Sequence, residues 1–170
     1  GKIRLSNTIL DSDALPVGIV PSTSAVTKVV YGKKPEAEVH YQNGVVEPVP
    51  FEKLSSFISE QENADNRLGV SSVVLRVPSK FLKNGLTFVD TPGVGSFHKN
   101  NTETAYQYMK ESDAVIFLLS VDSPINQIEI DFLRNTREFA GKFYFAVNKV
   151  DVVEEGELKE YMDYCRSLLC

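Results

Sequence analysis

The sequence predicts an α/β fold in which a mostly parallel sheet is covered by helices on both faces and carries an antiparallel edge. Strand-like and helical runs alternate through the second half of the chain, and right-handed crossovers stack such runs into a parallel sheet. Residues 113–120 contain the uninterrupted core Ala-Val-Ile-Phe-Leu-Leu, which is typical of a central parallel strand. Asn43-Gly44 lies between two short β-like runs and predicts a hairpin at the antiparallel edge.

Bulk composition fits one globular unit and excludes several classes of protein. The chain has 170 residues, of which 42% are hydrophobic and 24% charged, enough for one sizeable core. A net charge of −5 without a basic block argues against nucleic acid as a partner and against direct docking to an anionic membrane. No apolar run approaches the roughly 20 residues that span a bilayer, and no secretory signal is visible. Cys165 and Cys170 indicate packing thiols in a reduced, cytoplasmic compartment.

The first quarter of the chain is expected to form one helix and three strands. Apolar residues at helical spacing predict a helix over residues 2–10. After a loop, residues 25–31, 36–41 and 45–49 are β-like and are expected to pair as an antiparallel meander. Asn43-Gly44 suits a type I′ turn between the last two of these strands.

The next segments lead to a second pair of strands. Residues 51–60 are predicted to be helical, and the polar stretch 61–68, which has no period, is expected to be a mobile surface loop. The β-branched run 70–77 predicts a strand closed by Pro78. We expect it to pair with a strand over residues 86–89.

The second half is expected to alternate between helices and strands. Ser123 can cap one helix, with Pro124 at its first position, and a later helix carries a stripe that is either core or an interface. The predicted elements are a helix over 102–111, a strand over 113–120, the helix capped by Ser123, a strand over 143–147 and a last helix from Glu155. The residues expected to bury one face of the Ser123-capped helix are Ile125, Ile128, Phe132, Thr136, Phe139 and Ala140.

Asp90-Thr91-Pro92-Gly93 directly follows the predicted strand 86–89. Asp90 can offer a carboxylate to the water shell of a magnesium ion, and the backbone N–H of Gly93 can meet a terminal phosphate. Ligands of open parallel α/β sheets bind beyond the carboxyl ends of the strands, where this segment is expected. The alternative is an ordinary Pro-Gly turn.

Asn148-Lys149-Val150-Asp151 follows the predicted strand 143–147 and has the chemistry of a guanine reader. Asp151 can accept hydrogen bonds from N1–H and from the exocyclic amine, Asn148 can reach the opposite edge of the ring, and the stem of Lys149 can lie across its face. Such a short string also arises by chance, so its position after a core strand is what favours nucleotide binding over a polar turn.

The chain resembles the GTPase domain of dynamin-like proteins, most closely the bacterial branch. The resemblance rests on Asp-Thr-Pro-Gly-Val-Gly-Ser at 90–96, Asn-Lys-Val-Asp at 148–151 and Leu-Pro-Val-Gly-Ile-Val-Pro-Ser-Thr at 15–23. The phrases at 84–89 and 112–117 extend it over nearly the whole chain. It implies a P-loop NTPase-like three-layer sandwich that binds GTP or GDP with Mg²⁺ and hydrolyses GTP to drive membrane remodelling.

The resemblance also assigns roles to residues of the site. Thr23 would be the switch threonine that reaches the metal and positions water, while Val94 stands where Ras-like GTPases carry a glutamine. The catalytic set it implies is Thr23, Gly93 and Lys2. The metal set is Thr23 and Asp90. The nucleotide-binding set is Gly1, Lys2, Thr23, Asp90, Gly93, Asn148, Lys149 and Asp151.

The chain departs from the family pattern at its start. The phosphate loop has the form G-x-x-x-x-G-K-[ST], but here Ile3 follows Gly1-Lys2 and offers no oxygen to magnesium. We expect residues 1–170 to be a partial GTPase domain that begins inside this loop, ends before the last guanine-contacting loop and turns over GTP weakly alone. The alternatives are a degenerate, non-hydrolysing interaction module and a binding scaffold without nucleotide.

The resemblance further implies a nucleotide-dependent homodimer across the nucleotide face. It implies a cytoplasmic protein with peripheral membrane association, which would use segments outside these residues.

Overall fold

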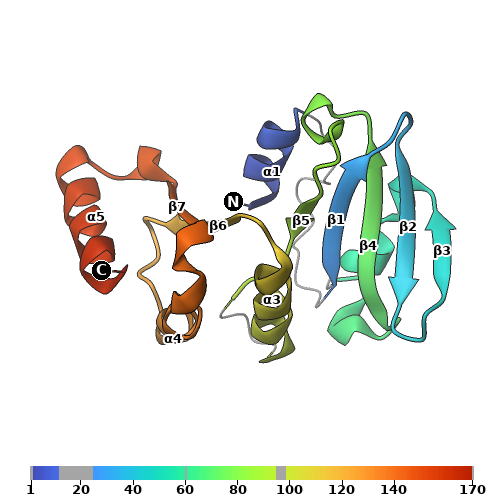
Figure 1. Cartoon of the computed structure of the whole chain (residues 1–170). Helices are drawn as coiled ribbons and strands as arrows, with labels where there is room; N and C mark the ends of the chain where they lie inside the picture. The colour runs from blue at the N-terminus through green and yellow to red at the C-terminus, as the bar shows by residue number, and fades with distance from the viewer. Residues whose placement is uncertain (1, 12–24, 60, 95–98, 170) are drawn as a thin grey trace. The chain divides into compact units, whose positions relative to one another are not determined.

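The structure, a computed structural model, describes residues 2–11, 25–59, 61–94 and 99–169. The chain divides into two compact units, Gly1–Thr104 and Ala105–Cys170 (Figure 1). Both units combine helices with strands, and the predicted α/β class with parallel strands and an antiparallel edge is confirmed.

The first unit is built on one five-stranded sheet of order β3-β2-β4-β1-β5, visible in Figure 1. β1 and β4 are parallel, whereas the pairs β1–β5, β2–β3 and β2–β4 are antiparallel. The strands are β1 (Val26–Tyr31), β2 (Glu36–Tyr41), β3 (Val46–Val49), β4 (Val70–Val77) and β5 (Phe88–Asp90). The helices are α1 (Lys2–Leu10), η1 (Phe51–Lys53), α2 (Ser55–Ile58), η2 (Ala64–Asn66) and η3 (Lys80–Leu82), and α3 (Lys99–Glu111) crosses the boundary in the sequence between the two units.

Two predicted pairings are wrong, because β4 separates β1 from β2 and β1 separates β4 from β5. The connection after β1 explains the first error. Gly32 donates its N–H to the carbonyl of Val77 at 3.0 Å, and a Cβ on Gly32 would lie only 2.6 Å from Cβ of Arg76. The chain therefore passes close over the end of β4 and places β2 on the far side of that strand.

The β2–β3 hairpin is confirmed, but its turn is not type I′. Gly44 has a φ of +85°, whereas Asn43 is not among the residues with positive φ. Gly44 N–H donates to the carbonyl of Tyr41 at 3.0 Å, which makes a three-residue loop ending in a left-handed glycine. The side chain of Asn43 accepts from the N–H of Val45 at 3.0 Å.

The core of the first unit lies on one face of the sheet. Leu10 extends it from α1, and the hydroxyl of Ser79 donates to the Leu10 carbonyl at 2.6 Å, which satisfies an acceptor at the helix end. The predicted helix 2–10 is thus confirmed and is anchored at its C-terminal end. The buried core residues are Leu10, Ala25, Val29, Ala37, Val39, Val49, Leu54, Val70, Val73, Leu75, Val77 and Leu82.

The stretch 61–68 is not the simple surface loop that its composition predicts. Asn63 is only 1% exposed. Its Nδ2 donates to the carbonyl of Phe57 at 2.7 Å and to Oδ1 of Asn66 at 3.1 Å, and its Oδ1 accepts from the N–H of Leu68 at 3.0 Å. The predicted helix 51–60 is likewise shorter and consists of η1 and α2.

We expect Asn63→Ala to lower the free energy of unfolding by about 2–4 kcal/mol, because three hydrogen bonds of a buried side chain are lost together. Urea denaturation with an unchanged m-value measures this loss. Asn43→Ala is the matched control, since it removes one exposed hydrogen bond and is expected to cost less than about 1 kcal/mol. Equal losses for the two variants would contradict the structural role of Asn63.

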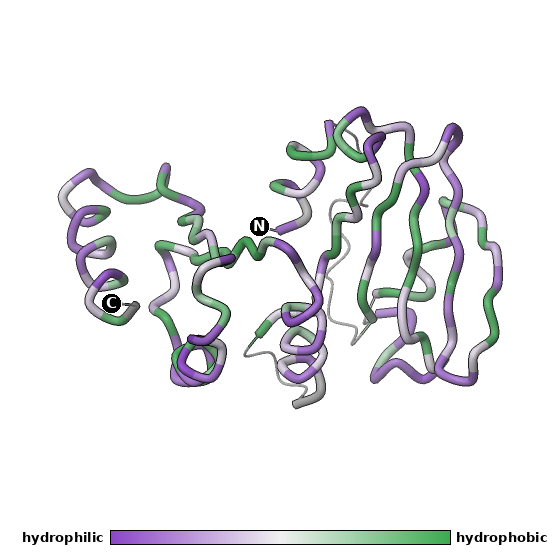
Figure 2. Tube along the Cα trace, in the orientation of Figure 1, coloured by the Kyte–Doolittle hydropathy of each residue, from purple (hydrophilic) through white to green (hydrophobic). Residues whose placement is uncertain are grey.

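The second unit contains a parallel pair, β6 (Val115–Ser120) and β7 (Phe143–Asn148), with the helices α4 (Gln127–Asn135), η4 (Arg137–Lys142), η5 (Val150–Val152) and α5 (Glu155–Leu169). β6 is hydrophobic from Val115 to Leu119 and is one of the continuous hydrophobic stretches in Figure 2. Phe117 packs with Phe132, Phe143 and Phe145 at ring-centroid distances of 6.1, 6.5 and 5.9 Å. Among the described residues, no helix is both long and apolar enough to cross a bilayer.

The start of α4 corrects another prediction. Ser123 belongs to a turn after β6, in which its N–H donates to the carbonyl of Ser120. Asn126 is the N-cap, because its side chain accepts from the N–H of Glu129 at 2.8 Å while Glu129 accepts from the N–H of Asn126 at 2.9 Å. This capping box satisfies two otherwise unpaired donors. The predicted apolar stripe holds for Ile125, Phe132 and Thr136, which are buried, but Ile128 is 51% exposed and Ala140 is exposed as well.

Candidate functional site

Lys2 and Asp90, two of the residues predicted to bind the phosphates and their metal and called phosphate-side residues below, meet at the N-terminal end of α1. Lys2 is the first residue of this helix, and its Nζ donates to the carbonyl of Thr91 at 2.7 Å. The same Nζ lies 3.8 Å from Oδ1 of Asp90. The sequence predicts both residues as parts of one site, and the structure brings them together from positions far apart in the chain.

Asp90 ends β5 opposite Thr27 of β1, and its side chain is only 18% exposed. Burial raises the pKa of its carboxyl, and the positive charge of Lys2 opposes this rise. Magnesium in nucleotide sites is commonly held by one or two carboxylates together with water and phosphate oxygens. A single sheltered carboxylate at a strand end fits that mode of binding.

Gly93 leaves room for a group from outside the chain. Its φ is not positive, and a Cβ added to it would have no described atom within 4 Å. Contacts among the described residues therefore do not require glycine at this position. An approaching phosphate would require it, because a side chain would fill the space in front of the backbone N–H. The positive end of the α1 dipole, at Lys2, also favours an anion.

The two described hydroxyl side chains of α1 are engaged by the helix itself. Ser6 donates to the carbonyl of Lys2 at 2.8 Å, and Thr8 donates to that of Arg4 at 2.9 Å. Neither replaces the metal oxygen that Ile3 cannot supply. Gly1 and Thr23 lie outside the described residues, so their predicted roles stay predictions.

The residues predicted to read the base, Asn148, Lys149 and Asp151, are called base-side residues below and lie at the end of β7 in the second unit. Asn148 ends the strand, in register with Ser120 of β6. Lys149 follows with the left-handed values φ 62° and ψ 30°. Asp151 is exposed and makes no hydrogen bond or ion pair with any described residue, so both carboxylate oxygens are available to accept from a base.

The structure adds Asp122, which the sequence reasoning missed. Nζ of Lys149 contacts Oδ2 of Asp122 at 2.5 Å, and the hydroxyl of Ser120 donates to Oδ1 of Asp122 at 2.6 Å. These two hydrogen bonds, the one from Lys149 foremost, lower the pKa of Asp122. A signal was present in the sequence, because Asp122 comes two residues after the end of the core strand β6, while Asp90 and Asn148 are the last residues of β5 and β7.

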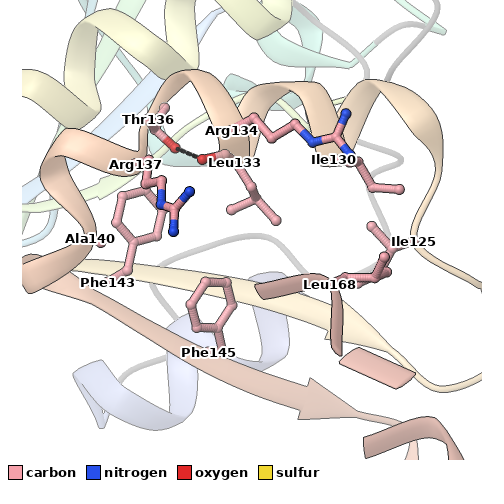
Figure 3. A pocket seen from close by; sticks show the side chains of 10 residues that line it. All are labelled: Ile125, Ile130, Leu133, Arg134, Thr136, Arg137, Ala140, Phe143, Phe145 and Leu168. Carbon is pink, nitrogen blue, oxygen red and sulfur yellow. Dashed lines mark hydrogen bonds between the residues drawn. The ribbon is translucent and has the colours of Figure 1, made fainter. Parts of the chain in front are cut away.

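A separate pocket of about 190 Å³ in the second unit is not part of the base-side site (Figure 3). Apolar residues of α4 and η4, the rings of Phe143 and Phe145, and Leu168 of α5 line it, together with Arg134 and Arg137. None of residues 148–151 contributes to its wall.

Comparison with known families decides the ancestry of these motifs. The sequence model of the Dynamin family matches residues 1–151, which include Lys2, Asp90-Gly93 and Asn148-Asp151. The chain belongs to the Dynamin family. The predicted identity as a dynamin-like G domain is thereby confirmed.

Two curated relatives of this dynamin-like domain match almost its whole length. An uncharacterized protein in the xynA 3′ region of Caldicellulosiruptor sp. is 34% identical over 169 residues, which cover 99% of this chain and 42% of that protein. Dynamin-like protein 1 of Campylobacter jejuni is 26% identical over 208 residues, which cover 99% of this chain and 28% of that protein. The chain thus spans less than half the length of either relative.

A solved structure has the same fold as this dynamin-like domain. It comes from work on an oligomerised bacterial dynamin pair, superimposes with a TM-score of 0.78 at 21% identity, and covers 99% of this chain and 28% of the other. The predicted fold class is confirmed by this likeness.

Proposed function

We infer that the chain is the guanine-nucleotide-binding part of a dynamin-like GTPase, which in full-length form hydrolyses GTP to GDP and phosphate to drive membrane fusion, fission or tethering. The observation that carries this proposal is the contact of Lys2, at the start of α1, with Asp90 and with the carbonyl of Thr91, two residues before the unobstructed Gly93. A cation, a sheltered carboxylate and an unobstructed backbone N–H are the groups that a nucleotide polyphosphate with its metal requires.

These positions, together with the resemblance to dynamin-like GTPases, support the following roles. The ammonium of Lys2 would neutralise the β- and γ-phosphates, and the N–H of Gly93 would donate to the γ-phosphate. Asp90, with Thr23, would hold Mg²⁺, which supplies neutralisation of charge on the phosphate oxygens. Asn148, Lys149 and Asp151 would select guanine. Lys2, Gly93 and Thr23 are the proposed catalytic residues.

Two features support a membrane-associated assembly for the full-length protein. The solved structure with the same fold is described as an oligomerised pair for sensing and tethering membranes, and an Arabidopsis thaliana relative, 26% identical, is described as a probable transmembrane GTPase. We extend the proposal to a nucleotide-dependent homodimer of a cytoplasmic protein that associates peripherally with a membrane through segments outside residues 1–170.

Fluorescent GDP and GTP analogues titrated onto the full-length protein, with and without Mg²⁺, test the proposal. We expect guanine nucleotide binding in which Mg²⁺ strengthens the affinity for GTP, and steady release of phosphate. Residues 1–170 alone are expected to turn over GTP weakly, because they match only the Gly-Lys of the G-x-x-x-x-G-K-[ST] pattern and therefore lack most of its backbone N–H groups, in addition to the oxygen that Ile3 cannot supply. Absence of binding by the full-length protein would overturn the GTPase proposal.

Binding without phosphate release by the full-length protein would favour the second candidate, a non-hydrolysing interaction module. The observation behind that candidate is Ile3 in place of a serine or threonine.

A further inference from the structure

The loop after β6 contacts the side chain of Lys149 through Asp122. Asp122 contacts the Lys149 ammonium at 2.5 Å through one oxygen and accepts from the Ser120 hydroxyl at 2.6 Å through the other. Both oxygens of this carboxylate are therefore committed, one to the lysine and one to the end of β6. The carboxylate is fixed in place by the same strand that supports the loop.

The backbone of this loop is joined to the base-side segment as well. Ser120 and Asn148 are partners in the parallel pair, and the N–H of Val121 donates to the carbonyl of Asn148 at 3.2 Å. Lys149 directly follows in a left-handed conformation, which is strained for a non-glycine residue. Such strain persists where the surroundings enforce it, and it often marks a functional segment.

We propose that Asp122 is a positioning residue of the base site. It holds the Lys149 ammonium so that the four-carbon stem is ordered as a platform for the guanine ring before the nucleotide arrives. This inference rests on the proposed guanine site, and it adds a residue that acts on the base only through Lys149. A side chain that is already ordered loses less conformational freedom on binding, which strengthens affinity by roughly threefold to tenfold.

The ion pair has little to contribute to folding. The side chains of Lys149 and Asp122 are 47% and 41% exposed, and exposed ion pairs add little to stability. A purely structural role therefore predicts little effect on any property, whereas the positioning role predicts a loss of nucleotide affinity at an unchanged melting temperature.

The test is a double-mutant cycle in the full-length protein with fluorescent GDP as the probe. Asp122→Asn is expected to raise the Kd by roughly threefold to tenfold. Lys149→Met keeps the apolar stem but removes the ammonium, and adding Asp122→Asn to it is expected to change the Kd by less than about twofold. Asp131→Asn is the matched control, since this exposed aspartate pairs with Arg134 at 3.9 Å on α4, and its Kd should equal that of the wild type.

Two results of the cycle would overturn the proposal. One is an unchanged Kd in Asp122→Asn. The other is a loss of affinity that is equally large with and without Lys149→Met, since Asp122 would then act on the loop rather than through the lysine.

A measurement without nucleotide separates this inference from the proposed function. ¹³C relaxation at Cε of Lys149 should report an ordered side chain in the wild type and a mobile one in Asp122→Asn. Equal mobility in the two proteins overturns the positioning role even if GDP binds. An ordered Lys149 in a protein that binds no guanine nucleotide overturns the proposed function instead.

Discussion

Asp151→Asn is expected to exchange guanine for xanthine as the preferred base. The Asp151 carboxylate can accept from N1–H and from the exocyclic amine of guanine, and no described residue competes for it. The amide NH₂ of asparagine can donate to the oxygen that xanthine carries in place of the exocyclic amine of guanine. In the variant this amine of guanine loses its acceptor, so the side chain matches xanthine better than guanine. We expect the affinity for GDP to fall on the order of hundredfold and the affinity for XDP to exceed it. Titration of fluorescent GDP and XDP measures both.

Asp163→Asn is the matched control for this change, because Asp163 is an exposed aspartate of α5 that pairs with Arg166 at 3.2 Å. It should leave both affinities unaltered. Asp122→Asn provides a second contrast. It changes the order of the Lys149 side chain and not the group that reads the base, so it should lower the affinities for GDP and XDP alike without inverting the preference. Unchanged selectivity in Asp151→Asn would show that this residue does not read the base.

Local patterns in the sequence were sufficient to place the main elements but not to pair the strands. The β-branched run at 70–77 and the apolar stripe after Glu155 became β4 and α5, because burial and periodicity act within a few residues. The order of strands depends on where a connection crosses the sheet. In this chain it depends on Gly32 packing against Arg76, a contact between residues far apart in the sequence.

Capping and loops show a similar limit. Ser123 and Asn126 are both suitable N-caps by residue type. The helix begins after Asn126 because Glu129, three residues later, completes a capping box with it. The polar composition of 61–68 gave no sign that Asn63 would be buried. Its amide satisfies main-chain groups on both sides of it, which composition alone does not reveal.

Part of the candidate site was predictable from the rule that ligands of open parallel α/β sheets bind beyond the carboxyl ends of the strands. That rule and the family resemblance placed Lys2 and Asp90 in one site, and their contact is present. The position of Asp122 just after a core strand was visible in the sequence, but its contact with Lys149 was not predictable, because that contact depends on the left-handed backbone at Lys149 and on the turn that carries Asp122. Side-chain pairings of this kind are decided by conformation rather than by spacing.

Lys2→Met is expected to abolish measurable binding of GDP and GTP. Methionine preserves most of the length and the apolar stem of the side chain but removes the cation beside Thr91 and Asp90. Charge-assisted hydrogen bonds to phosphate are among the strongest polar contacts in proteins, and no other lysine or arginine is paired with Asp90 among the described residues. A loss of at least roughly a hundredfold in affinity follows if the ammonium contributes about 3 kcal/mol. Isothermal titration with GDP, with and without Mg²⁺, measures it.

Lys142→Met is the control that separates loss of a cation from loss of a site. Nζ of Lys142 also donates to main-chain carbonyls, those of Ser112 at 2.7 Å and Lys110 at 3.1 Å, but none of the nucleotide motifs contains it. Its replacement should affect stability at most and leave nucleotide affinity intact. If Lys2→Met retained wild-type affinity, the contact between Lys2 and the end of β5 would only connect α1 to the sheet, and the phosphate-side half of the proposed site would have to be abandoned. If only Lys2→Met loses binding, the ammonium at the start of α1 is the group that holds the phosphates.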